Sequence, residues 1–373
     1  MKFTTPCYIV DLDRLFKNLR KISKLQSQTG CKVLLALKGH STAETLPFIL
    51  EHLDGLSASG AFEAKLSKEF DAVTSTFAPA YPPDTFPMVV ENSDMLVFNS
   101  FRQFQELAPT ARRNGVSCGI RINPQYSELP EDMGANPCRK SSHLGVLKEV
   151  LPPLAEFGPG KIEGIHLHTM CAQYADTLEH TIHHLIEQFK PYLERISWIN
   201  LGGGQLYGDD DYDMDRATQS IRLLKKCCSA SIFVEPCEGI LTQCGFLATR
   251  VLDVVHNDID IAILDSSAIC HLSDAVYRGW SRDVLGAGEP DELPYNIRLA
   301  GCSCYAGDIF GDYSFPAPLQ IGDLVIFQDA AVYTAVKACM FNGIPLPQTA
   351  LYSKRDGLSQ PKHYDYDLFR QTL

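Results

Sequence analysis

The sequence predicts an α/β protein: a (β/α)8 barrel followed by a C-terminal antiparallel β-barrel or sandwich domain. Three observations lead to this fold class. Strand-like apolar runs alternate with helical segments over roughly the first 240 residues, and such alternation produces a parallel sheet with helical crossovers. About eight of these units in some 230 residues is the expected size of a (β/α)8 barrel. After about residue 240 the segments become β-rich, separated by Gly, Pro, Asp and Asn.

The barrel elements follow in order from the N-terminus. An amphipathic helix that Gly30 ends comes first, because apolar residues recur at spacings of three and four: Leu12, Leu15, Phe16, Leu19, Ile22 and Leu25. The continuous apolar run over 33–37 then predicts a strand buried on both faces. We expect further strands over 56–59, 95–99, 117–122, 162–168, 196–201 and 232–235, and helices over 63–70, 101–114 and 176–195. A doubly wound open sheet is the alternative architecture.

The β-rich part defines the second predicted domain. Strands are expected over 246–255, 259–264, 297–300 and 324–327, and the strand-like start over 8–10 could join them. We therefore assign residues 11–240 to the barrel, and residues 1–10 with 241–373 to the β domain.

The charge balance restricts the partners. Lys and Arg number 33 against 45 Asp and Glu, which gives a net charge of -12. Such a surface repels nucleic acid and anionic membranes, and it suits a cationic small molecule. No apolar run approaches the roughly 18 residues of a membrane span, and the N-terminus lacks the apolar segment of a secretion signal.

The cysteines indicate the compartment. The chain has 13 cysteines but no CxxC pair, which argues against a zinc ribbon or a thioredoxin-type site. We interpret most of them as reduced, buried, small hydrophobic residues and expect a cytoplasmic protein.

Residues that could carry chemistry stand at four predicted strand ends, which in a barrel converge on one mouth. They are Lys38, the pair His166 and His168, the triplet Gly202, Gly203 and Gly204, and Glu235. Each also has a simpler interpretation: a solvated lysine, a plain turn, a carboxylate facing water. The two histidines could bind a metal, but no further ligand stands at a suitable spacing, so stacking or hydrogen bonding is favoured.

Together these residue types indicate pyridoxal 5'-phosphate (PLP). A lysine can form a Schiff base with the cofactor, backbone N–H groups of glycines can hold its phosphate, and a carboxylate can keep its pyridine nitrogen protonated.

The sequence resembles a known family at these residues. LALKGH, HLHTMC, INLGGG, VEPCEG, CSCYAGDIFGDYSF and DAAVYTAVKACMFNG resemble the alanine-racemase-fold (fold type III) decarboxylases, and most of all the carboxynorspermidine (carboxyspermidine) decarboxylases. TPCYIVDLDRL, LVFNSF, GIRINPQYSE and NPC extend the resemblance nearly from end to end. It implies a PLP-dependent lyase of polyamine biosynthesis that removes the α-carboxylate of carboxynorspermidine or carboxyspermidine, giving norspermidine or spermidine.

The resemblance also implies roles in cofactor binding. Lys38 would be the Schiff-base lysine, and His168 would stack on the cofactor face. The phosphate would be held by Tyr333 of the β domain together with the glycines, which are Gly202, Gly203 and Gly204. Glu235 would pair with the pyridine nitrogen, while Glu63 and Arg121 would support the ring pocket.

Two further residues are implied to act across a homodimer interface. Cys304 and Asp308 would reach into the partner's active site, Cys304 as the proton donor to the α-carbon and Asp308 as a substrate-binding residue. The active site would thus be shared between two chains.

Substrate choice is expected to depend on Glu238. Ornithine and diaminopimelate decarboxylases carry Arg where Glu238 stands, and an acid where Tyr305 follows the cysteine. A glutamate at this position favours an amine, so the resemblance implies a cationic, polyamine-like substrate. A glutamate in a surface loop is the simpler alternative.

The chain departs from the family pattern at Cys237, where the family has Gly, at Gln205, where it has His, and at His143, where it has Arg. Residues 316–333 also diverge. These changes leave open a paralogous decarboxylase of another diamino or N-substituted amino acid. Less favoured are a racemase, which needs a base where Cys304 stands, and a non-catalytic PLP-binding protein.

Overall fold

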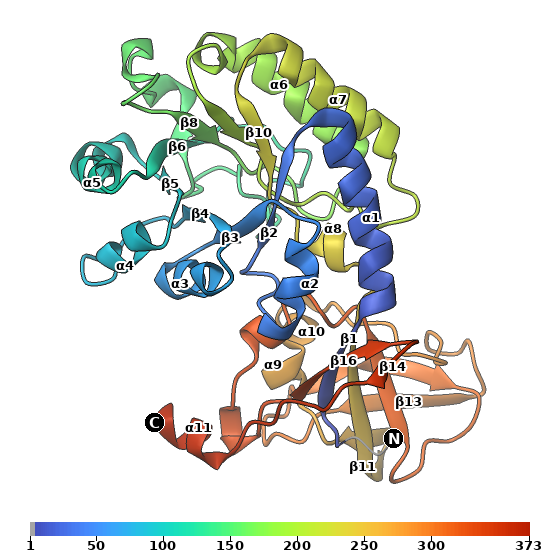
Figure 1. Cartoon of the computed structure of the whole chain (residues 1–373). Helices are drawn as coiled ribbons and strands as arrows, with labels where there is room; N and C mark the ends of the chain where they lie inside the picture. Colours follow the sequence, from blue (N-terminus) through green and yellow to red (C-terminus); the bar gives the residue numbers. More distant parts are fainter. Residues whose placement is uncertain (1–3) are drawn as a thin grey trace. The chain divides into compact units, whose positions relative to one another are not determined.

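The computed structural model describes residues 4–373, which divide into two compact units (Figure 1). The barrel unit comprises Lys17–Ile240, and the described residues of the β unit are 4–16 with Leu241–Leu373. Residues 1–3, part of the segment 1–10 that we assigned to the β domain, lie outside the described residues.

The barrel unit contains a closed ring of eight parallel strands within the described part of the chain. They are β2 (Lys32–Ala36), β3 (Gly55–Ala58), β4 (Val73–Phe77), β5 (Met95–Phe98), β6 (Ser117–Asn123), β8 (Gly164–His166), β9 (Trp198–Asn200) and β10 (Ser231–Val234). Each strand pairs with the next, and β10 pairs with β2 to close the ring. The short β7 (Val146–Leu147) adds to β6. The predicted barrel is confirmed, and the open sheet is excluded.

Helices surround the barrel strands (Figure 1). They are α1 (Leu12–Thr29), α2 (Leu46–Leu50), α3 (Ala61–Glu69), α4 (Phe86–Glu91), α5 (Phe101–Arg113), α6 (Ala175–Leu193), α7 (Met214–Cys227) and α8 (Glu238–Leu241), with the 3-10 helices η1 (Ala43–Thr45), η2 (Lys148–Val150) and η3 (Leu154–Glu156). Local sequence explains several ends. The Ser100 side chain caps α5 by accepting from the Gln103 N–H, and basic residues in the last turn of α5 favour its C-terminal dipole.

The strand β4 was not predicted, because its sequence VTSTF is too polar to resemble a buried strand. Thr74, Ser75 and Thr76 are nonetheless buried. The Thr74 hydroxyl bonds that of Ser67 at 2.7 Å, and the Thr76 hydroxyl bonds that of Ser93 at 2.7 Å. Buried hydroxyls that find partners do not carry the cost of unpaired polar groups, so this strand can lie in the ring.

The β unit is built on one sheet. Its strands are β1 (Cys7–Asp11), β11 (Gly245–Asn257), β12 (Ile259–Leu264), β13 (Tyr295–Ala300), β14 (Ile309–Phe315), β15 (Leu324–Gln328), β16 (Gln348–Ser353) and β17 (Gly357–Leu358). Its helices are α9 (Ala268–His271), α10 (Ser273–Arg278), α11 (Tyr366–Gln371), η4 (Ala335–Lys337) and η5 (Phe341–Gly343). The core between them includes Phe310 and Phe327, whose rings stack with centroids 4.6 Å apart.

The predicted antiparallel order of this sheet needs a correction. The strand predicted over 8–10 does join the sheet, as β1, but β1 pairs with β16 in parallel, and β12 pairs with β13 in parallel. The sheet is therefore mixed. Long connections separate the strands of both parallel pairs, and such connections permit the parallel direction that a tight hairpin forbids.

Two other expectations concern the whole chain. All 13 cysteines are free, but six are buried, so the interpretation of most as buried residues was wrong. Within residues 4–373, none of the helices is both long enough and apolar enough to cross a membrane.

Candidate active site at the barrel mouth

Four of the predicted site features lie where barrel strands end. Lys38 follows β2, His168 follows β8, the glycines begin after β9, and Glu235 follows β10 directly. Because all the barrel strands are parallel, their carboxyl ends share one side of the barrel, which we call the barrel mouth. The sequence prediction that these residues converge is consistent with this geometry.

Lys38 lies just beyond the end of β2, and its side chain is exposed. Protein atoms nonetheless surround it closely. Burial lowers the pKa of its ammonium, the Glu235 carboxylate opposes this change, and the Arg121 guanidinium adds to it. A lysine with a lowered pKa is more often neutral, and the neutral amine is the form that attacks a carbonyl carbon.

Glu235 is held as a buried carboxylate. Its Oε1 accepts a hydrogen bond from Asn200 Nδ2 at 2.6 Å, and its Oε2 lies 3.4 Å from His166 Nε2. Burial by itself raises the pKa of Glu235. The hydrogen bond and charge of His166, the hydrogen bond from Asn200 and the charge of Lys38 lower this pKa to about 2. A carboxylate that stays ionised is the partner that a protonated pyridine nitrogen requires.

The two histidines have different surroundings. His166 contacts the Glu235 carboxylate through Nε2, and its ring stacks on Phe77 with centroids 5.4 Å apart. The Arg121 guanidinium also packs on Phe77, 4.6 Å from the ring centroid. His168 Nδ1 instead accepts the Gly203 N–H at 3.0 Å, and burial, followed by Lys38 and Arg121, holds the His168 pKa well below its usual range. His168 is therefore neutral and held in a fixed orientation by the glycines.

No metal site accompanies these histidines. Among residues 4–373, no group of three or more His, Cys, Asp or Glu side chains is arranged to hold a metal ion.

The glycines 202–204, the glycine loop, are needed for close packing. Gly202 has φ +70° and Gly204 has φ +97°, and a Cβ on Gly202 would lie 2.5 Å from Leu167 O and 2.6 Å from His168 Nδ1. A Cβ on Gly203 would collide with the Glu235 carbonyl oxygen. Only glycine combines these φ angles with this packing.

Two backbone N–H groups of the glycine loop donate hydrogen bonds to other protein atoms. The Gly202 N–H donates to Asn200 Oδ1 at 2.9 Å, and the Gly203 N–H donates to His168 Nδ1. Phosphate binding through the loop therefore stays a prediction, and it depends most on the N–H of Gly204.

These residues fit PLP. The mouth offers a lysine with a lowered pKa, an ionised carboxylate, and a glycine loop that tolerates no side chain. His166 Nδ1 is in addition a buried nitrogen for which the described residues supply no partner. Lys38 would hold the cofactor aldehyde, and Glu235 its pyridine nitrogen.

Glu238 begins α8 immediately after Cys237, and it is half-buried. Cys237 is buried, and its thiol pKa is raised by burial and then by the Glu238 charge, while the Lys38 charge opposes the rise. A Cβ on Gly239 would collide with the Gln205 carbonyl oxygen, so the first turn of α8 packs directly on the segment that follows the glycine loop. This placement favours a role at the barrel mouth over the alternative of a surface loop.

The two other departures from the family pattern differ in their surroundings. Gln205 is buried, and its Nε2 lies 3.6 Å from Met170 Sδ. His143 is exposed, and its carbonyl oxygen accepts a hydrogen bond from Asn99 Nδ2 at 2.8 Å. Of the two, Gln205 is the one that continues the glycine loop.

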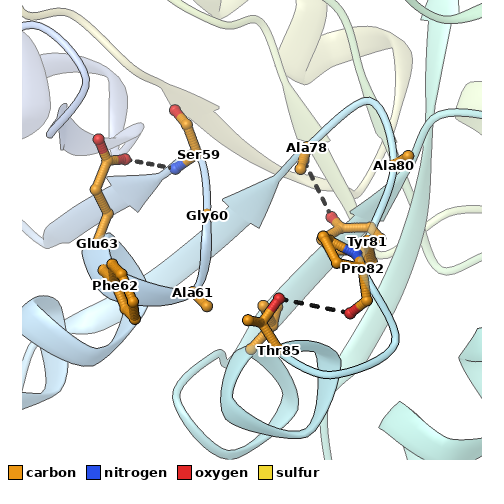
Figure 2. A pocket seen from close by; sticks show the side chains of 11 residues that line it. Ser59, Gly60, Ala61, Phe62, Glu63, Ala78, Ala80, Tyr81, Pro82 and Thr85 are labelled. Atoms are coloured by element: carbon orange, nitrogen blue, oxygen red, sulfur yellow. Dashed lines mark hydrogen bonds between the residues drawn. The ribbon is translucent and has the colours of Figure 1, made fainter.

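A pocket of about 410 Å³ opens beyond the ends of β3 and β4 (Figure 2). Its two walls are the segments 59–63 and 78–85, and its lining is mostly apolar. Glu63 Oε2 accepts the Ser59 N–H at 2.6 Å, and burial raises the Glu63 pKa although Ser59 opposes the rise. Tyr81 fixes the other wall, since its hydroxyl donates to Val97 O at 2.6 Å. The pocket was not predicted from the sequence, because one of its walls follows β4, a strand that was not predicted.

The remaining predicted residues lie in the β unit. Cys304 is exposed, and its N–H donates to Asn342 Oδ1 at 2.8 Å. Asp308 is buried on the same loop. Tyr333 follows β15 with φ +55°, and the Lys337 ammonium lies 5.1 Å from its ring centroid. The roles given to these three residues stay predictions.

Comparison with known proteins identifies the family. The family described as pyridoxal-dependent decarboxylase, C-terminal sheet domain, matches residues 7–331. Carboxynorspermidine/carboxyspermidine decarboxylase of Campylobacter jejuni is 32% identical and aligns over 98% of this chain and 97% of its own. Carboxyaminopropylagmatine decarboxylase of Synechocystis is 34% identical over 99% of this chain and 95% of its own.

A solved structure agrees with the sequence matches. The crystal structure of carboxynorspermidine decarboxylase from Campylobacter jejuni, complexed with norspermidine, superposes with a TM-score of 0.91 at 30% identity and covers 100% of both chains. The expectation of a PLP-dependent decarboxylase is thereby confirmed. The chain belongs to the carboxynorspermidine/carboxyspermidine decarboxylase family of fold type III PLP-dependent decarboxylases.

Proposed function

We propose that this enzyme removes the α-carboxylate of carboxynorspermidine or carboxyspermidine, giving norspermidine or spermidine in polyamine biosynthesis. The observation that carries the proposal is Glu238, a half-buried carboxylate at the barrel mouth beside Cys237, whose thiol interacts with Lys38. A carboxylate favours ammonium groups, and it disfavours a second acid on the substrate. The solved relative that binds norspermidine adds support.

A second candidate substrate is carboxyaminopropylagmatine. The Synechocystis relative named for it matches as well as the Campylobacter jejuni enzyme, with 34% against 32% identity. It is an N-substituted amino acid of the kind that the departures at Cys237, Gln205 and His143 leave open. Agmatine ends in a planar guanidinium rather than an ammonium, so a site selects between the two by the geometry of its acceptors.

The residues of the barrel mouth have distinct tasks in this reaction. PLP, when bound, stores the electron pair that remains when CO2 leaves. Lys38, with its lowered pKa, would hold the cofactor at its aldehyde carbon until the substrate amine takes its place. Glu235, whose lowered pKa keeps it ionised, would keep a proton at the pyridine nitrogen of the cofactor. His168, whose ring is held by the Gly203 N–H, would support the cofactor face.

Proton return is assigned to Cys304. The bond between the α-carbon and the carboxylate breaks, CO2 departs, and the α-carbon then takes a proton from the Cys304 thiol, which is reprotonated from solvent. Cys304 would act in the active site of a second copy, so the proposal includes a homodimer. A reducing, cytoplasmic location is part of it too, and 13 free cysteines are consistent with that compartment.

The test is CO2 release by the PLP-loaded enzyme. The panel contains carboxynorspermidine, carboxyspermidine, carboxyaminopropylagmatine, meso-diaminopimelate, ornithine, lysine and arginine. Highest kcat/KM for the first two supports the proposal, and highest kcat/KM for the third supports the second candidate. Inversion of a substrate without CO2 release would show a racemase, and bound PLP without turnover on any compound would contradict the role given to Glu238.

A further inference from the structure

Asp308 closes the loop that carries Cys304. Residues 301–308, which we call the Cys304 loop, connect β13 to β14. The Gly301 N–H donates to Asp308 O at 2.7 Å, and the Asp308 N–H donates to Tyr305 O at 2.9 Å. The two ends of the loop are therefore bonded to each other, with Cys304 between them.

The Asp308 side chain bonds inward. Its Oδ1 accepts from the Ser267 hydroxyl at 3.0 Å and from the Ile269 N–H at 3.0 Å, at the start of α9. Its Oδ2 accepts from the Ser303 N–H at 3.1 Å, next to Cys304. Only 2% of the residue is exposed, so this carboxylate is satisfied by its own unit.

The neighbouring residues accommodate this arrangement. A Cβ on Gly301 would collide with Asp308 Oδ2, so the close approach of the carboxylate requires glycine there. Two further bonds hold the same loop: the Cys302 N–H donates to Ser266 O at 3.0 Å, and the Cys304 N–H donates to Asn342 Oδ1. The backbone on both sides of Cys304 is thus fixed while its thiol stays exposed.

We propose that Asp308 is a positioning residue, which sets the place of the Cys304 thiol by tying Ser303 to α9, and that it does not contact the substrate. This inference rests on the proposed function in one respect, the role of Cys304 as proton donor. It replaces the substrate-binding role that the sequence resemblance implied for Asp308. A buried carboxylate with three donors has little capacity left for a substrate ammonium.

The test uses the full-length, PLP-loaded enzyme with the substrate that the panel identifies. Asp308→Ala removes all three bonds. Asp308→Asn keeps an acceptor for Ser267 and Ile269 but turns an amide N–H toward the Ser303 N–H. Each variant is made alone and together with Cys304→Ala. Asp312→Asn is the matched control, because Asp312 lies on β14 and pairs only at the surface, with Arg298 at 2.7 Å.

Asp308→Ala is expected to lower kcat roughly 10- to 100-fold, the loss that follows a displacement of about 1 Å in a reacting group. KM should change less than about 2-fold, since no substrate contact is lost. Asp308→Asn should fall between wild type and Asp308→Ala. The double variant with Cys304→Ala should be no slower than Cys304→Ala alone, because Asp308 acts through that thiol. Asp312→Asn should match wild type.

Three outcomes would overturn the inference: a raised KM at unchanged kcat, which indicates substrate binding; losses that multiply in the double variant; or wild-type kcat in both Asp308 variants. If Asp308→Ala does not fold, the same comparisons are made with Asp308→Asn. Failure of the proposed function is recognised separately. It shows as no CO2 release by the wild type, or as full kcat in Cys304→Ala.

Discussion

The barrel mouth and the Cys304 loop hold their polar residues in different ways. At the mouth, Lys38 and Glu235 shift the pKa values of each other, and the Arg121 guanidinium lowers the pKa of Lys38. In the loop, the single charge of Asp308 is bonded to three uncharged donors, and Cys304 stays exposed. The surroundings at the mouth therefore set the protonation states of its side chains, whereas the bonds in the loop set the position of its backbone beside Cys304. Substitutions at the mouth should change cofactor binding and pH dependence, and those in the loop should change kcat.

The largest effect is expected for Lys38→Ala. Without the amine, the visible absorbance of the lysine-bound cofactor should disappear and turnover should fall at least about 10³-fold, or roughly 4 kcal/mol. Lys32→Ala is a suitable control, because Lys32 lies at the other end of β2 with its ammonium 5.8 Å from the Phe233 ring centroid. Normal turnover in Lys38→Ala would contradict the whole assignment of the barrel mouth.

Glu235→Gln should cause the second largest loss of activity. Because it removes a charge but hardly changes the shape of the side chain, it tests whether charge is what matters at the mouth. Activity should fall on the order of 10²-fold, as when one electrostatic partner of a reacting system is removed. The pH dependence should change as well. The Glu235 pKa is about 2 in the folded chain against an ordinary 4.5, so its stabilising effect is complete above about pH 4.5 and is lost as pH falls toward 2.

Denaturant unfolding of wild type and Glu235→Gln, both without cofactor, measures this stabilising effect. The difference in unfolding free energy should be larger at pH 7 than at pH 3. A difference independent of pH would show that the Glu235 charge is not stabilised in the folded chain.

Glu238→Arg should lower kcat/KM for the carboxylated polyamine by about 10- to 100-fold, which is roughly 1.4 to 2.8 kcal/mol. The reason is repulsion between the new guanidinium and the cationic substrate. Cofactor retention should change little. Glu187→Arg, an exposed position within the helix α6, makes the same change in net charge outside the segments that follow the ring strands and serves as the control. Equal kcat/KM for Glu238→Arg and wild type would remove Glu238 from substrate recognition.

Gly202→Ala is expected to have the smallest effect of the four on the chemical step, and it tests whether cofactor binding at the mouth depends on close packing. Its Cβ would press on His168 Nδ1 and Leu167 O, so PLP should dissociate faster and the free energy of unfolding should fall. Gly160→Ala is a matched control: Gly160 has φ +71°, close to the +70° of Gly202, but a Cβ there meets nothing within 4 Å. It should lose only the roughly 1 to 2 kcal/mol of backbone strain. Equal losses would mean that contacts around Gly202 are unimportant.

The sequence by itself determined the barrel and most of its mouth. Lys38, His168, the glycine loop and Glu235 stand at the ends of predicted strands, and parallel strands bring their ends to one side whatever the details of packing. The helix α7 could also have been found from its sequence, because Ala217, Ile221 and Leu224 recur at helical spacing and are buried.

The partners of these residues needed the tertiary structure. His166 and Asn200 hold Glu235 from two other strands, and no spacing in the sequence connects the three. The hydroxyl pairs of β4 join residues from different elements, and they allow a polar segment to be a buried strand. Because this strand was not predicted, the pocket beside Glu63 was not predicted either.

The inward turn of Asp308 was also decided only by tertiary structure. The motif CSCYAGDIFGDYSF places an acid near Cys304, but the donors of Ser267 and Ile269 come from a separate stretch of the chain. Periodicity and strand order are local properties that a sequence displays directly. The pairing of buried polar groups depends on which distant segments pack together, and it is this pairing that sets the charge of Glu235 and the place of Cys304.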